Sequence, residues 1–237
     1  YGLAYLTASQ RPLFAITAEE EILSSPFFNI FVTLPLGLYL QEEALSLVET
    51  RLAQTNLTFS NELTQHLLFL VGPHPFLLHI AGYNAYQALS QGQSLETPED
   101  IARLDGAIEM EARSHLGYLW HNLTAVEQHS FAIADGPIDS LRQLEQQCLL
   151  AYVDNDYVYT SELMRRFVRR QEVAGLIQAE PFVIDQQRHQ VWANGQEVNL
   201  TTSQFSILVR LCQQSGQVVH GDDLETAVWG DVLVDDP

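Results

Sequence analysis

Lysine, the residue on which phosphate-binding loops and amine chemistry depend, does not occur in this chain. All eleven of its Lys and Arg residues are arginine. A P-loop needs a lysine that reaches the β and γ phosphates of a nucleotide, and Schiff-base catalysis needs the lysine amine itself. We therefore predict no catalytic residue within these 237 residues and expect them to be catalytically inert on their own.

Two patterns that are sometimes typical of metal sites favour ordinary structure here. Asp154-Asn155-Asp156 lacks the glycine and the distal glutamate of a calcium loop, so we interpret it as a hairpin tip. Cys148 and Cys212 lie in apolar stretches that we expect to be helical, without a CxxC motif or zinc-ligand spacing, and we interpret them as reduced thiols. No metal site is predicted.

The one basic cluster consists of Arg165, Arg166, Arg169 and Arg170. Like charges four residues apart on a helix repel one another modestly unless acidic groups face them. Contact with nucleic acid is one interpretation of this cluster. Charge runs on helices are usually solvated or paired, however, and the chain has a formal net charge of −19. We therefore favour docking of these arginines against the acidic remainder of the protein.

The C-terminal segment predicts three short strands followed by two helices. Asn194-Gly195 is typical of a hairpin, because both central residues of a type I′ turn need positive φ. Thr201 and Gln204 form a capping-box pattern, and apolar residues repeat at helical spacing from Phe205 to Cys212. A shorter helix is expected from Asp222 to Trp229. The expected strands are Phe182–Asp185, which in isolation looks like a Walker B strand, Gln190–Ala193 and Gln196–Leu200.

This segment resembles the OmpR/PhoB-type winged-helix effector domain of bacterial response regulators. The resemblance implies DNA binding by a third helix in the major groove, with a C-terminal hairpin as the wing. Only seven residues follow Gly230, so we expect a truncated domain without its recognition helix. From Pro181 onward two arginines accompany eight acidic residues, which is the wrong sign for phosphate contacts. Thr201 and His220 remain as weak candidates for DNA contact, although His220-Gly221 stands where the family usually has Ser-Arg.

The N-terminal third predicts a strand, a helix and a strand, followed by helices. The capping pattern from Thr17 to Glu20 separates two apolar runs, an order that suggests parallel β/α structure. Helices are then expected from Gln41, over Asn61–Val71, and from Gly72-Pro73-His74-Pro75 onward, where proline suits a first turn. The two apolar runs are Leu3–Thr7 and Asn29–Pro35.

This order, over roughly residues 3 to 92, resembles the C-terminal part of a STAND-type signalling ATPase, a relative of the AAA+ proteins. The resemblance implies that Thr7 and Arg11 are sensor-like residues that face a γ-phosphate, and that Pro75 is the lid proline that packs on the nucleotide base. It also implies ATP or ADP as the cofactor of the parent protein, with the P-loop and the Walker B strand upstream of Tyr1. In the alternative interpretation Pro75 only starts a helix and Arg11 pairs with a nearby acid.

The central third predicts a small winged helix. A long helix is expected over Pro98–His115, and a capping box at Thr124–Glu127 starts another. After the break at Gly136-Pro137, a helix is expected through Leu141, Leu144 and Cys148. A hairpin over 149–160 and a last helix capped by Ser161 follow. In the resembled ATPases such a unit follows the lid and rests against the nucleotide domain.

These elements together predict a mainly α fold with small β units. The expected parts are the C-terminal end of an NTPase core (1–40), a helical lid with its linker helix (41–117), a winged helix (118–175) and an incomplete effector domain (178–237). The function expected from them is a fragment of an ATPase-coupled transcriptional regulator whose partner is promoter DNA. The acidity argues against attachment to membranes, and the sequence has no signal segment, so we expect a cytoplasmic protein.

Two alternatives stay open. In the first, the C-terminal unit binds protein rather than DNA, which its acidity permits, and the parent is a scaffold ATPase. In the second, the ATPase resemblance is spurious and the chain is a helical adaptor with two small β units.

Overall fold

The computed structural model describes residues 6–8, 32, 34, 36–194 and 196–229. The chain divides into two units, residues 1–37 and residues 38–237, and each is described by itself. In the first unit the described side chains of Leu6, Val32, Leu34 and Leu36 are exposed. The predicted strands and helix of this unit lie largely or wholly outside the described residues, and so does Arg11.

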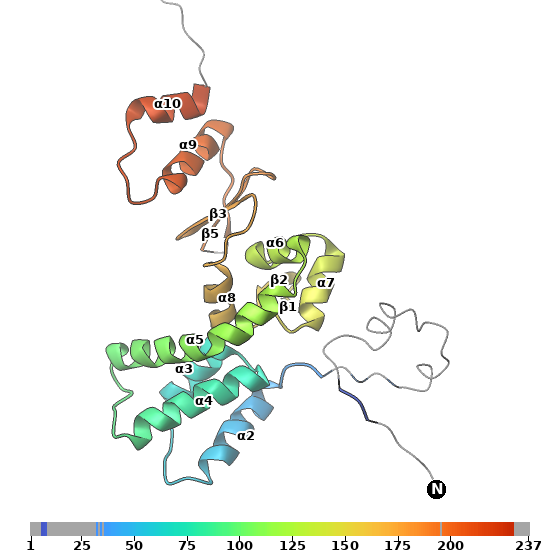
Figure 1. The fold of residues 1–237 in the computed structure, drawn as a ribbon, viewed down its shortest axis with the longest axis vertical. Coiled ribbons are helices and arrows are strands. Elements are labelled where there is room, and N and C mark those ends of the chain that lie inside the picture. The colour runs from blue at the N-terminus through green and yellow to red at the C-terminus, as the bar shows by residue number, and fades with distance from the viewer. Residues whose placement is uncertain (1–5, 9–31, 33, 35, 195, 230–237) are drawn as a thin grey trace, which may run out of the picture. The chain divides into compact units, whose positions relative to one another are not determined.

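Four helices, which we call the N-terminal helices, open the second unit (Figure 1). They are α2 (Gln41–Leu52), α3 (Asn61–Val71), α4 (Pro75–Ser90) and α5 (Pro98–His121). The Ser60 hydroxyl accepts a hydrogen bond from the Leu63 amide, and Thr97 forms a capping box with Asp100, so side chains fix the starts of α3 and α5. The predicted starts of all four are confirmed, but α5 continues past the expected end at His115 to His121.

The central unit comprises α6 (Ala125–Ile133), α7 (Ile138–Gln146), β1 (Leu150–Val153), β2 (Asp156–Tyr159) and α8 (Glu162–Val168). The predicted hairpin is confirmed, with positive φ at Asp154 and Asn155 as a type I′ turn requires. The prediction that Cys148 is helical was wrong. Cys148 has a φ of 60°, and its amide and that of Leu149 donate back to Glu145 and Leu144, which is the Schellman arrangement that ends a helix.

One apolar core joins the N-terminal helices to the central unit. Leu67 of α3, Ile108 of α5, Leu144 of α7 and Leu163 of α8 belong to the same cluster of buried side chains. Each buried leucine or isoleucine contributes about 1.5–3 kcal/mol relative to an exposed one. These elements therefore form a single packed body.

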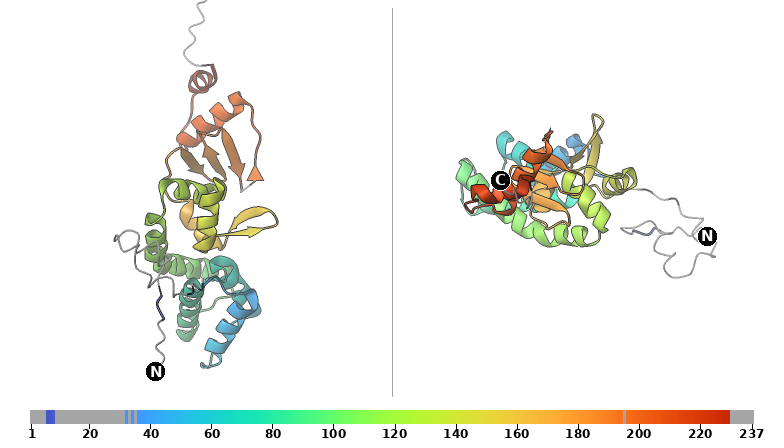
Figure 2. Two further views of the ribbon diagram at one scale, coloured as in Figure 1. Left: turned by 90° about the vertical axis from the view of Figure 1, so that its right-hand side faces the viewer. Right: turned by 90° about the horizontal axis from the view of Figure 1, so that it is seen from above.

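The C-terminal unit is an antiparallel sheet in the order β3-β4-β5-β6 followed by two helices. The strands are β3 (Leu176–Ala179), β4 (Phe182–Asp185), β5 (Gln190–Ala193) and β6 (Gln196–Glu197), and the helices are α9 (Thr202–Gln213) and α10 (Gly221–Trp229). Strand β3 was not predicted, and β6 is shorter than the predicted Gln196–Leu200. Helix α9 packs on the sheet through Phe205, which shares a small core with Ile184 and Val191 (Figure 2).

The capping box at Thr201 and Gln204 is confirmed. Gly195, the second residue of the predicted turn, lies outside the described residues. Over the described ranges, no helix has both the length and the apolar character needed to cross a membrane.

Candidate functional site

The turn between α3 and α4 carries the predicted lid proline. Pro75 occupies the first turn of α4, and the His74 side chain caps the helix by accepting a hydrogen bond from the Leu77 amide. The Phe76 side chain is 45% exposed. A Cβ at Gly72, which has a φ of 62°, would lie 2.1 Å from the carbonyl oxygen of Thr160. The turn is therefore pressed against the junction of β2 and α8, and only glycine fits it.

Two histidines flank this turn. The ring of His115, from α5, lies 6.1 Å from the ring of His74 and 4.3 Å from that of Phe76. Burial, together with the charge of His115, lowers the pKa of His74, and burial lowers the pKa of His115. The neutral imidazoles are thus favoured, as the cap requires, because only an unprotonated Nδ1 accepts a hydrogen bond.

Beside the turn, a groove of about 590 Å³ lies among α2, α3, β2 and α8. Its walls include the apolar side chains of Leu68, Phe69 and Val158 as well as the charged Glu162 and Arg165. No set of three or more histidine, cysteine, aspartate or glutamate side chains with metal-binding geometry occurs among the described residues.

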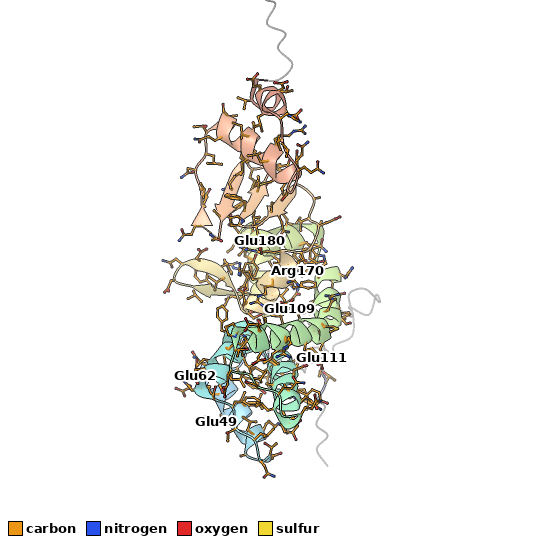
Figure 3. The ribbon with its side chains drawn as sticks, turned by 90° about the vertical axis from the view of Figure 1, so that its left-hand side faces the viewer. Glu49, Glu62, Glu109, Glu111, Arg170 and Glu180 are labelled. Atoms are coloured by element: carbon orange, nitrogen blue, oxygen red, sulfur yellow. The ribbon has the colours of Figure 1, made fainter. Side chains whose placement is uncertain are left out.

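The predicted arginine cluster lies opposite acidic residues of α5. Arg166 Nη1 is 3.0 Å from Asp105 Oδ2 and 3.2 Å from Glu109 Oε1. Arg170, two residues after α8, places Nη1 2.8 Å from Glu109 Oε2 (Figure 3). His66 of α3 adds a contact of 2.6 Å between its Nε2 and Asp105 Oδ1. The spacing of four residues between the two acids matches that between the two arginines.

The other two arginines of the cluster have different partners. Arg165 donates two hydrogen bonds of 2.6 Å to the Glu162 carboxylate, which also accepts one of 3.1 Å from Arg166. Arg169 Nη1 lies 3.9 Å from the exposed Glu180 carboxylate. Each of the four arginines therefore has an acidic partner within the protein.

Charge pairing shifts the pKa values of this network. Burial alone would raise the pKa of Glu109, but hydrogen bonds from Arg170 and Arg166 outweigh it and lower the pKa. The pKa of Glu162 is lowered against the same opposing effect by Arg165 and Arg166. Burial opposes ionisation of Arg166, yet hydrogen bonds to its carboxylate partners raise its pKa further. The charged forms are thus favoured on both sides.

A second polar contact joins the central unit to the C-terminal unit. Asp185, the last residue of β4, has a side chain that is 0% exposed. Its Oδ1 accepts hydrogen bonds from the amides of Gln187 and Arg188, at 2.9 and 3.0 Å. His129 Nε2 of α6 lies 2.8 Å from its Oδ2. Asp185, which ends the Walker B-like run, is therefore a buried hydrogen-bond acceptor between the central unit and the C-terminal unit.

Further contacts surround this junction. Gln178 of β3 donates from Nε2 to the carbonyl of Gln171, which follows α8, at 3.0 Å. Arg188 Nη1 is 3.8 Å from Asp135 Oδ2, in the loop after α6. Leu176 packs against the larger apolar core. The sheet is thus attached to the central unit at several points.

The predicted DNA-contact candidates do not lie together. Thr201 caps α9, and its hydroxyl accepts from the Gln204 amide. His220 directly precedes α10. Arg210 Nη2 of α9 lies 3.8 Å from Asp223 Oδ1, so the start of α10 lies beside the later part of α9. Nine residues of helix separate Thr201 from Arg210, about 13 Å along the axis. Thr7 is exposed and belongs to the other unit of the chain.

Sequence reasoning missed His66, His129 and the acidic partners on α5. The histidines carry no pattern, because their partners lie 39 and 56 residues away along the chain. Asp105 and Glu109 did offer a signal, since their spacing equals that of Arg166 and Arg170. Two helical segments that carry opposite charges at positions i and i+4 can form ion pairs with each other when they pack side by side.

Comparison with known families divides the chain into two matched regions. Residues 1–137 match the model of the family Novel STAND NTPase 2. Residues 195–237 match the model described as Transcriptional regulatory protein, C terminal. Both resemblances inferred from the sequence are thereby confirmed. No curated protein and no solved structure matches the chain.

Proposed function

The chain belongs to the Novel STAND NTPase 2 family, whose model covers more than half of it, and we propose that it works as a nucleotide-controlled regulator of transcription. The observation that carries this proposal is the succession, on one chain, of a region matching an NTPase family and a region matching the C-terminal domain of transcriptional regulators. The central unit begins within the first region and continues past its end, and it packs on the N-terminal helices and is hydrogen-bonded to the C-terminal unit. Residues 41–117 are the proposed lid with its linker helix, and residues 118–175 are the proposed winged helix.

ATP or ADP is the proposed ligand of the parent protein. The half-exposed ring of Phe76 beside Pro75 is a surface on which a purine base could pack. Thr7 and Arg11 are proposed to approach the γ-phosphate. Residues 1–237 hold no lysine for a P-loop, so we assign them no catalytic step.

Promoter DNA is the proposed partner of the C-terminal unit. Helices α9 and α10 are proposed to support the DNA-binding surface. Thr201 and His220 are proposed to contact DNA at the edge of these helices. Arg210 is already paired with Asp223, and acidic side chains open α10, so these two helices provide little positive charge for phosphates. Base reading is therefore not assigned to α9 or α10.

The arginine cluster is proposed to dock the winged helix on the lid rather than to bind nucleic acid. Arg166 and Arg170 reach carboxylates of α5 at 2.8–3.2 Å. An arginine held in this way has few donors free for a phosphate. A nucleotide-dependent movement of the lid would then carry α8 with it.

One alternative function has a specific observation in its favour. The first turn of α10 holds Asp222 and Asp223, an acidic surface that suits a basic protein better than DNA. In this alternative the protein is a scaffold whose C-terminal unit recruits a protein partner.

Binding of DNA by the full-length protein distinguishes these functions. Genomic fragments would be selected on the protein, and the affinity for a recovered fragment measured with ATP and with ADP at one salt concentration. We expect the two affinities to differ by about tenfold, within the usual range of allosteric coupling. Equal affinities would contradict nucleotide control, and failure to select any fragment would favour the scaffold.

A further inference from the structure

The buried carboxylate of Asp185 has hydrogen-bond partners in both the C-terminal unit and the central unit. Two of them, the amides of Gln187 and Arg188, come from its own β4–β5 turn. Its Oδ2 lies 3.8 Å from Nε of Arg188, in the same turn, and 2.8 Å from Nε2 of His129, which belongs to α6. A buried carboxylate needs several donors, because it is removed from water. The complete set of donors therefore exists only while the C-terminal unit lies against α6.

The connection between α8 and β3 is short and is bonded on both sides. It runs from residue 169 to residue 175. Gln178 binds the carbonyl of Gln171 in this connection, and the carbonyl of Gly175 accepts from the Gln186 amide at 3.0 Å. A Cβ at Gly175, which has a φ of 83°, would lie 2.9 Å from Gln187 Nε2. The connection thus behaves as part of the junction and not as a free linker.

Apolar packing also contributes to this junction. The cores on its two sides are separate clusters, and Leu176 is a partly buried side chain of β3 that packs on the larger one. Apolar contacts are not directional, whereas hydrogen bonds fix both distance and angle. The orientation of the C-terminal unit must then be set mainly by polar contacts.

We propose that His129 and Asp185 form a latch that holds the C-terminal unit in one orientation on the central unit. His129 is a positioning residue in this arrangement, since its side chain is 17% exposed and its ring reaches the fully buried Asp185. The existence of the latch does not depend on the function proposed above. Only its use, to pass nucleotide-driven movement of α8 to the DNA-binding unit, rests on that function.

The latch is tested by a distance distribution between two spin labels on the full-length protein. Gln143→Cys on α7 and Ser203→Cys on α9 provide exposed labelling sites, with Cys148 and Cys212 replaced by alanine. We expect a narrow distribution with His129 present. In His129→Ala it should broaden by about twofold or more, because the C-terminal unit loses its hydrogen bond to α6 and the remaining contacts of the junction restrict its orientation less.

Two further variants make the result specific. His121→Ala removes an exposed histidine of α5 that contacts its own helix through Gly117, and it should leave the distribution narrow. His129→Gln keeps an N–H donor and should restore part of the order. Circular dichroism and thermal unfolding of each variant would establish that both units remain folded.

Three results would overturn the latch: a narrow distribution in His129→Ala, a broad one in the parent protein, or equal broadening in His121→Ala. The nucleotide dependence of DNA binding is measured separately, with and without His129→Ala. Absence of DNA binding together with a narrow parent distribution would refute the proposed function and leave the latch intact. If the latch passes the movement of α8 to the DNA-binding unit, His129→Ala should remove most of the difference between the DNA affinities measured with ATP and with ADP.

Discussion

The N-terminal helices and the central unit share one apolar core, whereas the central unit and the C-terminal unit have separate cores and meet through polar contacts. At the first junction Arg166 and Arg170 add ion pairs to side chains that are already packed. At the second, His129 and Asp185 are central to the contact. The first junction should resist separation as strongly as the interior of a domain does.

The two junctions therefore differ in how much free energy is needed to separate them. Separating α5 from α8 exposes buried apolar surface, at a cost of about 25 cal/mol per Å². Separating α6 from β4 breaks hydrogen bonds that water largely replaces, so its net cost is about 0.5–1.5 kcal/mol per hydrogen bond. A change of state within residues 38–229 would therefore be expected to keep the N-terminal helices and the central unit together and to act at the second junction.

The largest expected effect tests the shared core. Leu163→Ala, on α8, should destabilise the N-terminal helices and the central unit together by about 2–5 kcal/mol, because it leaves a cavity among side chains of both. Hydrogen exchange should report faster opening of α3 and α5 as well as of α8. Met110→Ala, at an exposed site of α5, should change stability by less than about 0.5 kcal/mol.

An effect of Leu163→Ala confined to α8 would contradict a shared core. It would mean that the N-terminal helices unfold independently of the central unit, and that the two regions are joined no more tightly than the central and C-terminal units are.

The next effect tests the close approach of the α3–α4 turn to the central unit. Gly72→Ala should cost about 1–3 kcal/mol, since the added methyl group meets the Thr160 carbonyl and the φ of 62° is strained for alanine. Gly82→Ala, in the interior of α4 with open space around it, should be neutral or stabilising by up to about 1 kcal/mol. Urea denaturation of both variants measures this contrast, and equal stabilities would refute the close approach.

A smaller effect is expected from the ion pairs. Arg166→Ala leaves Asp105 and Glu109 without their shared partner and should cost about 1–2 kcal/mol, a value reduced by partial exposure of the arginine. Arg103→Ala, where the side chain is 71% exposed and pairs with Asp100 within α5, should cost less than about 0.5 kcal/mol.

The salt dependence of the two arginine variants sharpens the assignment. Ionic strength screens exposed pairs most, so the deficit of Arg166→Ala relative to the parent should shrink only modestly in 1 M salt. A deficit equal to that of Arg103→Ala would show that the pairs across α5 and α8 add nothing to the shared core.

Local patterns in the sequence predicted most of the elements but few of their contacts. The starts of α4, α6 and α9 followed from caps and from proline, which act within one turn of the chain. Strands β5 and β6 followed from the Asn194-Gly195 hairpin signal between them. Strand β3 was missed because its four residues, Leu176–Ala179, have no alternating pattern of their own and are specified by pairing with β4.

Of the candidate site, only the charged residues could be predicted from the sequence. The arginine cluster could be read directly, and its acidic partners share its spacing. Asp185 was read as the end of a strand, but nothing local indicates that it is buried against a histidine 56 residues earlier. A single hydrogen bond between distant segments leaves no periodicity, and so the junction between the central and C-terminal units had to come from the structure.

The smallest expected effect is a dependence on pH at the α3–α4 turn. Burial lowers the pKa of His115, and burial with the charge of His115 lowers that of His74, so the folded protein binds protons less readily than the unfolded chain, in which histidine titrates near about 6.5. Stability is therefore fully present above that value and is lost as the pH falls through the lower folded pKa. His115→Gln should flatten the slope of unfolding free energy between about pH 7.5 and 5.5. Ser114→Gln, at the exposed neighbouring position, should keep the parent slope, and a parent slope in His115→Gln would mean that α5 and the turn are not coupled through this ring.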